Sequence, residues 1–157
     1  MKIYISYFYQ IRFFTSNIIP LSTCVSDPSY FHNFTGNKKY KFKDKRGVWN
    51  GLRAEPFVPD DTCKCLCRGP EFCDTHNPDE CGFLRHYYIQ LQHLDFNEMI
   101  SRFERLGKTV QKNEGFFEEP IVILLVHEAP DNPCSERWPL IEWFAAHGYE
   151  LEEWNHG

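Results

Sequence analysis

The clearest hydrophobic pattern in the chain is the run IVILLV at residues 121–126, which is apolar at six consecutive positions. A strand with one solvated face alternates apolar and polar residues, whereas a strand of a parallel sheet covered on both faces is apolar throughout. The run therefore predicts a central buried strand. A polar loop follows at once and carries His127, Glu128, Cys134, Ser135 and Arg137. Because ligands of open α/β sheets bind at the carboxyl ends of the strands, this loop is the expected site.

Shorter segments predict three further strands. Residues 3–8 and 18–23 are rich in β-branched and aromatic residues, and residues 149–154 alternate between apolar and polar positions. Pro20 marks either the start of the second segment or an irregularity at a sheet edge. We expect these segments to share one sheet with residues 121–126.

Two amphipathic helices are predicted between residues 83 and 107. Apolar residues recur at three- and four-residue spacing from 83 to 94, which defines the buried stripe of the first helix. Asp95 and Glu98 have the spacing of a capping box and predict the start of the second helix. Gly107 is expected to end it, since glycine is the common residue just after a helix.

A third helix is predicted after the polar loop. Proline has no N–H group and fits only the first turn, so the helix begins between Ser135 and Pro139, and it stops at Gly148. The order of strands and helices favours a doubly wound, Rossmann-like α/β sandwich with a mostly parallel sheet. We interpret residues 1–157 as a single domain that contains a cysteine-rich insertion at residues 60–82.

Composition narrows the class of protein. The 157 residues have a net charge of −5, which argues against nucleic-acid binding by bulk charge, and the local lysine cluster at 38–46 is more typical of a solvated loop. No apolar run reaches the length of a membrane span, and the N-terminal segment lacks the pattern of a secretion signal. We therefore expect a cytoplasmic protein without membrane contact, whose seven cysteines are thiols or metal ligands rather than disulfides.

The insertion contains five cysteines within nineteen residues, CKCLCRGPEFCDTHNPDEC. Thiolates grouped this closely suit a structural zinc ion with four sulfur ligands, which would order a segment that has few apolar residues. Cys65 could replace one of the first two ligands, His76 could also bind, and an iron–sulfur cluster is the alternative cofactor. The predicted ligands are Cys63, Cys67, Cys73 and Cys81.

The loop after the central strand carries the candidate chemistry. Glu128 could act as general base or bind a ribose hydroxyl, and Cys134 near the helix start is a candidate nucleophile, because a helix N-terminus and a nearby cation favour a thiolate. A structural cysteine and a solvated carboxylate are the simpler alternatives. Arg137 could bind a phosphate in two-point fashion, or pair with Glu136 or Glu142.

Polar residues after the other strands converge on the same edge if the sheet is parallel. Ser22 and Thr23 lie at the end of the second strand, Arg53 lies in a later turn, and Ser135 lies in the loop after the central strand. Hydroxyls and two arginines beside a carboxylate suit a nucleotide or sugar phosphate better than an apolar ligand.

Several motifs together resemble the domain of unknown function 488 family, in particular a phage-type branch of it. These are YISYFYQIRFF, the LST after the second strand, DPSYFHNF, GLRAEPFVP, LLVHEAPDNPCSER and the later EWF, and they cover most of the chain. The family pattern of glutamate, proline, cysteine and a basic residue corresponds to Glu128, Pro130, Cys134 and Arg137. The commoner form of the family has a second cysteine and a histidine where this chain has Val126 and Ser135. The resemblance implies a Rossmann-like fold and no specific activity.

Two hypotheses of function follow. The first is a phage-encoded enzyme that acts on a nucleotide, nucleoside or nucleic-acid base in the host cytoplasm, with Glu128 and Cys134 as catalytic residues and Arg53, Ser22, Thr23, Ser135 and Arg137 as ligand contacts. The alternative is a non-catalytic binding protein that sequesters a nucleotide signal or engages a host protein.

Overall fold

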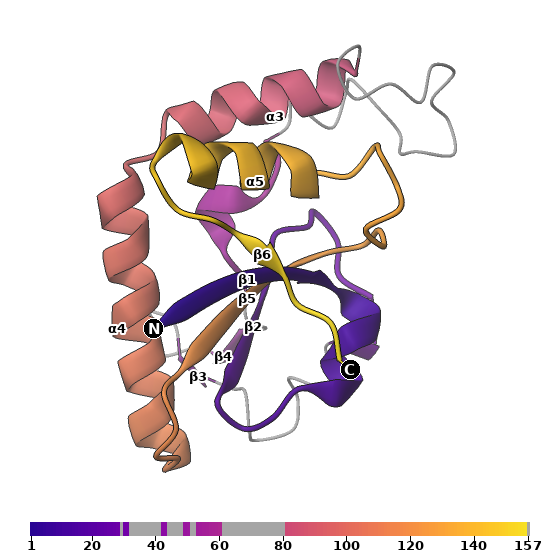
Figure 1. The fold of residues 1–157 in the computed structure, drawn as a ribbon. Helices are drawn as coiled ribbons and strands as arrows, with labels where there is room; N and C mark the ends of the chain where they lie inside the picture. Colours follow the sequence, from indigo (N-terminus) through magenta and orange to yellow (C-terminus); the bar gives the residue numbers. More distant parts are fainter. Residues whose placement is uncertain (29, 32–41, 44–48, 51–52, 61–80, 157) are drawn as a thin grey trace.

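A computed structural model describes the chain except for residues 29, 32–41, 44–48, 51–52, 61–80 and 157 (Figure 1). Its centre is a sheet of four parallel strands in the order β2-β5-β1-β6. The strands are β1 (Lys2–Tyr7), β2 (Ile18–Ser22), β5 (Ile121–Val126) and β6 (Glu152–Glu153). A separate antiparallel pair is formed by β3 (Phe42–Lys43) and β4 (Trp49–Asn50). The α/β class and the parallel sheet are therefore confirmed.

Strand β5 is an inner strand of the sheet, as its uninterrupted apolar sequence predicts. It pairs with β1 from Lys2↔Ile121 to Tyr7↔Val126 and with β2 on its other side. Val122, Leu124 and Val126 pack into the cluster on one face of the sheet, while Ile123 and Leu125 pack into the cluster on the other. Apolar residues are needed at consecutive positions because both faces are covered.

Three α-helices contribute to the same face of the sheet (Figure 1). They are α3 (Gly82–Gln92), α4 (Phe96–Glu114) and α5 (Arg137–Ala146). The short 3₁₀ helix η3 (Glu55–Phe57) adds Phe57 to this cluster. The opposite face is covered by the 3₁₀ helix η1 (Phe8–Phe13) with Phe31 and the segment around Trp154. Both faces are thus covered as in a Rossmann-like sandwich, although the long helices lie on one side.

Helix α4 begins as predicted and ends later. The Asp95 side chain accepts a hydrogen bond of 3.0 Å from the Glu98 backbone N–H, which confirms the cap. The predicted end at Gly107 is wrong, because the helix continues to Glu114 and Gly115 adopts the left-handed conformation that ends it. A Cβ atom at Gly107 would lie 3.0 Å from Met1 Sδ and 3.2 Å from Pro120 Cβ, so this glycine permits close packing inside the helix.

The last helix and the last strand lie where the sequence predicts them, but the strand is shorter than predicted. Pro139 is the third residue of α5, in the first turn as predicted, and Gly148 with φ 78° follows the helix. The predicted strand at 149–154 is shorter than expected, since only Glu152–Glu153 form β6. In the described ranges of the chain, none of the helices has the length and hydropathy needed to cross a membrane.

Candidate functional site

Buried polar side chains are concentrated at one edge of the sheet. Of the residues with a described environment, the buried polar or charged ones all lie near or just beyond the carboxyl ends of β1, β2 and β5. Polar groups are buried only at a cost unless they form hydrogen bonds, so such a concentration needs a specific reason. The residues are Ser6, Gln10, Ser22, Thr23, Ser135, Glu136 and Arg137.

The carboxyl end of β2 forms a first polar group, around Asp27. Ser22 Oγ donates to Asp27 Oδ1, and Arg53 Nη1 lies 3.2 Å from Asp27 Oδ2. Arg53 Nη2 also donates to the Cys24 carbonyl, and Nε lies 3.2 Å from a Glu55 carboxylate oxygen. The structure thus brings the predicted ligand residues Ser22 and Arg53 together, and it places the Arg53 guanidinium in internal contacts.

The loop between β5 and α5 forms a second group. Ser135 Oγ lies 3.4 Å from Glu128 Oε2 and accepts a hydrogen bond of 3.2 Å from the Arg137 N–H. Arg137 Nη1 donates to the Glu128 carbonyl at 2.7 Å. Three residues predicted from sequence to share a site are therefore in contact. The Glu128 side chain is half-buried and reaches the surface, whereas Ser135 and Arg137 are fully buried.

Arg137 is paired within the protein. Its Nε donates to Glu153 Oε1 at 2.6 Å and its Nη2 to Glu153 Oε2 at 3.4 Å, a two-point arrangement with an acid on β6 rather than with Glu136 or Glu142. Burial raises the pKa of Glu153 above its ordinary value, and the charge of Arg137 offsets part of that shift. An anion would have to compete with Glu153 for this guanidinium.

Glu136 is a buried carboxyl group, which the sequence predicts only as a possible ion-pair partner of Arg137. Its Oε1 lies 3.2 Å from Thr23 Oγ1 and 3.2 Å from Cys24 Sγ. Burial, with a further contribution from the charge of Glu128, raises the pKa of Glu136 to about 8, although the contacts with Cys24, Thr23 and Arg137 act in the opposite direction. Glu136 therefore holds a proton near neutral pH.

The neighbours of Glu136 are two hydrogen-bond donors. Thr23 Oγ1, which also lies 2.9 Å from the Leu125 carbonyl, donates to Glu136 Oε1 at 3.2 Å, and the Cys24 thiol donates to the same oxygen at 3.2 Å. Burial and the adjacent Glu136 raise the pKa of the Cys24 thiol, which stays protonated. The position of Cys24, directly after Ser22 and Thr23, is the only sequence signal that could have found it.

Cys134 and His127 flank this arrangement. Cys134 is 8% exposed, and its N–H donates to Asn132 Oδ1 at 2.9 Å. The helix begins at Arg137, within the predicted range, with Glu136 at the N-cap position, so Cys134 precedes the N-cap by two residues. His127 is exposed, and its Nε2 lies 2.6 Å from the Ser26 carbonyl oxygen. The nucleophilic role of Cys134 stays a prediction.

The predicted metal ligands fall largely outside the described residues. Cys63, Cys67 and Cys73 belong to the range 61–80, while Cys81 is described as a buried residue at the N-cap position of α3. Among the described residues, no group of three or more histidine, cysteine or acidic side chains could hold a metal ion. The zinc and iron–sulfur hypotheses therefore stay predictions.

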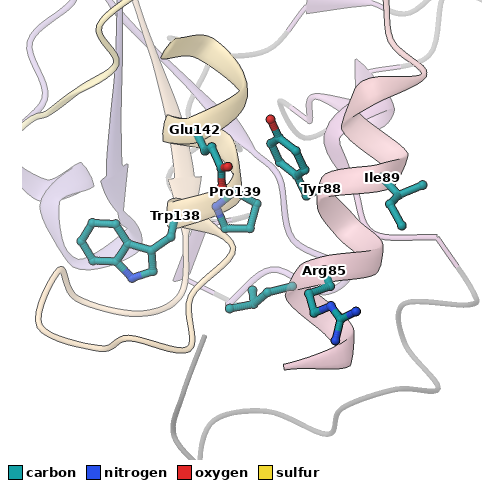
Figure 2. Close-up of a pocket in the computed structure, with 7 residues that line it drawn as sticks. Arg85, Tyr88, Ile89, Trp138, Pro139 and Glu142 are labelled. Carbon is teal, nitrogen blue, oxygen red and sulfur yellow. The ribbon is translucent and has the colours of Figure 1, made fainter. Parts of the chain in front are cut away.

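A groove of about 430 Å³ lies beside the site, between α3 and α5 (Figure 2). Tyr88 and Glu142 approach each other from the two helices, whereas the Trp138 ring extends from the other side of α5. Trp138 Nε1 donates to the Asn132 carbonyl at 3.0 Å, so the first turn of α5 connects this groove to the β5–α5 loop. The lining residues are Leu84, Arg85, Tyr88, Ile89, Trp138, Pro139 and Glu142.

Comparison of the chain with protein-family models, curated proteins and solved structures gives no match. The fold and site define the class on their own, as an α/β protein with a four-stranded parallel sheet and a polar carboxyl edge. The resemblance to the domain of unknown function 488 family stays a prediction that depends on the motif residues.

Proposed function

We propose that the protein is an enzyme that acts on a nucleotide, nucleoside or nucleic-acid base at the carboxyl edge of its sheet. The observation that carries this proposal is a pair of carboxyl groups in unlike environments. Glu136 is buried with a raised pKa, while Glu128, close enough for its charge to act on Glu136, reaches the surface. Carboxyl groups whose surroundings differ in this way are typical of sites that transfer protons.

Glu128 has the position expected of the acid/base group or ribose anchor. Its carboxylate lies 3.4 Å from Ser135 Oγ, and its backbone carbonyl is held by Arg137, so both ends of the residue are fixed. A carboxylate at the end of a parallel strand can accept a hydrogen bond from a sugar hydroxyl or a proton from a reacting group. Glu136 would act through Glu128, by limiting how much negative charge the pair carries.

Both arginines of the site are already paired with carboxylates. This pairing favours an uncharged part of the substrate, the base or the ribose, as the group that binds beside Glu128. Arg53 contacts Asp27 and Glu55, and Arg137 contacts Glu153. A phosphate would have to displace a carboxylate from either guanidinium, whereas a base or ribose needs only the hydroxyl, amide and carboxylate groups nearby. We therefore place the base or sugar beside Glu128 and any phosphate further out.

The test is turnover by a Glu128→Gln variant. Purified protein is incubated with panels of nucleosides, nucleotides and free bases, and products are identified by mass spectrometry. Loss of a general acid or base lowers the rate about 10²–10⁴-fold, so Glu128→Gln should be almost inactive. The exposed Glu118 gives the matched control, Glu118→Gln, which should keep full activity. Full turnover and affinity in Glu128→Gln would contradict the proposal.

The binding-protein alternative differs in one measurable property. If Cys134 is a nucleophile, a thiol reagent at neutral pH should label it faster than Cys24, whose thiol is held neutral. Ligand binding without turnover, together with an inert Cys134, would favour a protein that sequesters a nucleotide or engages a host protein. A phage origin and a cytoplasmic location stay predictions in both cases.

The cysteine-rich insertion carries a separate proposal of a structural zinc ion. Elemental analysis of the purified protein should find one zinc per chain and no visible absorption band. Iron with a broad visible band would support the cluster alternative instead. A folded protein that contains neither metal would contradict both.

A further inference from the structure

Exposed apolar surface gathers around the same edge of the sheet as the buried polar groups. Four of the six exposed large apolar or aromatic side chains of the described chain follow the carboxyl end of β1, β2 or β5. They are Tyr9, Val25, Tyr30 and Trp138, which are between 38% and 48% exposed. Exposed aromatic groups beside a polar site are typical of a surface that receives a ligand.

The Tyr9 ring is in contact with a cation. The guanidinium carbon of Arg12 lies 3.7 Å from the centre of the Tyr9 ring, and Arg12 Nε donates to the Tyr9 carbonyl at 2.9 Å. The guanidinium group therefore lies over the face of the Tyr9 ring. None of the ion pairs between described residues involves Arg12, in contrast to Arg53 and Arg137. We call Tyr9 and Arg12 the stacking platform.

The stacking platform is connected to the site by a short series of contacts. Tyr7, the last residue of β1, lies opposite Val126 in the sheet register, and its ring centre is 5.9 Å from the Arg137 guanidinium. The Tyr7 and Tyr9 rings are nearly parallel, with centres 6.4 Å apart and 18° between their planes. Tyr9 therefore contacts Tyr7, and Tyr7 contacts Arg137, the residue that donates a hydrogen bond to the Glu128 carbonyl.

We propose that the stacking platform of Tyr9 and Arg12 binds the aromatic base of a nucleoside or nucleotide substrate. This inference deepens the proposed function and rests on it. Every base has a planar π surface that stacks on tyrosine rings and on guanidinium planes, and this contact tolerates changes of base. Arg12 also supplies a positive charge for a phosphate, which the internally paired Arg53 and Arg137 do not.

The test compares binding of a mononucleotide with binding of the same sugar phosphate without its base. Adenosine monophosphate, cytidine monophosphate and ribose 5-phosphate are titrated into the whole protein by calorimetry. Tyr9→Leu removes the ring from a half-exposed position, so it should fold normally, and Tyr9→Phe keeps the ring. Phe117→Leu removes an aromatic side chain that is 98% exposed elsewhere and is the matched control.

Loss of one stacking contact should weaken nucleotide binding in Tyr9→Leu about fivefold to hundredfold. Tyr9→Phe and Phe117→Leu should bind like the wild type, and ribose 5-phosphate should be unaffected by all three changes. Arg12→Gln should weaken both the nucleotide and the sugar phosphate.

The outcomes separate this inference from the proposed function. If Tyr9→Leu binds nucleotides as well as the wild type while Glu128→Gln abolishes turnover, the stacking platform is overturned and the proposed function stands. If the wild type neither binds nor converts any nucleoside, nucleotide or base, both are overturned.

Discussion

The two ends of the parallel sheet are built differently. At the amino ends of the strands, polar contacts lie at the surface: the N-terminal ammonium pairs with the exposed Glu119, and Asn17 Nδ2 donates to the Glu119 carbonyl at 3.0 Å. At the carboxyl ends, Thr23, Glu136 and Arg137 are buried. Thr23 Oγ1 donates to the Glu136 carboxyl group, and Arg137 donates to the Glu128 carbonyl. Among the described residues, none of the buried polar side chains lies at the amino ends, so the pairing of the strands there does not depend on such groups. The difference supports the proposal that the carboxyl end binds a ligand and carries the chemistry.

Among the changes that compare the two ends of the sheet, substitution of Arg137 should cause the largest loss of folding stability. Arg137→Met removes the guanidinium and leaves Glu153 and the Glu128 carbonyl without their partner. Breaking a buried ion pair on one side costs about 3–5 kcal/mol of folding free energy. Denaturant unfolding should show this loss, whereas Arg102→Met, which breaks an exposed pair with Glu98, should cost less than about 1 kcal/mol. Equal losses of stability in Arg137→Met and Arg102→Met would show that the buried ion pair contributes no more than the exposed one.

The second prediction concerns Glu136 and pH. Its pKa in the folded protein is about 8, above its ordinary value of 4.5, so the folded state keeps a proton that the unfolded chain has released. Stability from this group is fully present below pH 4.5 and is lost as pH rises through 8. Glu136→Gln stays neutral and should gain about 2 kcal/mol on the wild type between pH 6 and 8. Parallel stability curves for the two proteins would show that Glu136 is ionised in the folded state.

Two threonines allow the two ends of β2 to be compared directly. Thr23 lies just beyond the carboxyl end and its buried hydroxyl contacts Glu136, whereas Thr15 precedes the amino end and its exposed hydroxyl donates to Asn17 Oδ1 at 2.7 Å. Replacing each by valine removes the hydroxyl and keeps the shape. Thr23→Val should cost about 1–2 kcal/mol, because partners are left unsatisfied in the interior, and Thr15→Val less than about 0.5 kcal/mol. Thermal unfolding of both variants measures the two losses of stability. A loss in Thr15→Val as large as that in Thr23→Val would contradict the prediction.

The smallest effect is expected at Gly107, near the amino end of β5. Alanine favours a helix interior by about 0.5–1 kcal/mol, but its Cβ would press on Met1 Sδ and the Pro120 ring. Met1 is a flexible side chain that can shift, and the two terms should nearly cancel, leaving a change below about 1 kcal/mol. A loss of several kcal/mol on unfolding would show that this end of the sheet is packed as tightly as the other.

Sequence patterns predicted the sheet because its physical cause is local. Six consecutive apolar residues have few solutions other than a strand with two covered faces, and Pro139 fits only a first helical turn. The end of α4 was missed because glycine serves both to end helices and to permit close packing, and the sequence does not distinguish Gly107 from Gly115.

The sequence predicted which residues of the candidate site lie close together better than it predicted their ion-pair partners and burial. Glu128, Ser135 and Arg137 all lie in the segment that follows one strand, and the structure brings them into contact. The acid that pairs with Arg137 comes from a different strand, β6, and the burial of Glu136 depends on the path of the loop. The spacing of residues along the chain predicts neither the Arg137–Glu153 pair nor the burial of Glu136, because both depend on which distant segments pack together.

A nucleotide site at the carboxyl edge can be tested by backbone amide chemical-shift mapping of the protein during titration with adenosine monophosphate. We expect the shifts to concentrate at the carboxyl end of the sheet, at residues 7–12, 23–28 and 127–137. Amides near residues 15–17 and 117–121, at the amino end, should not move. Shifts confined to the amino end, or none at millimolar nucleotide, would contradict a nucleotide or nucleoside site at the carboxyl edge.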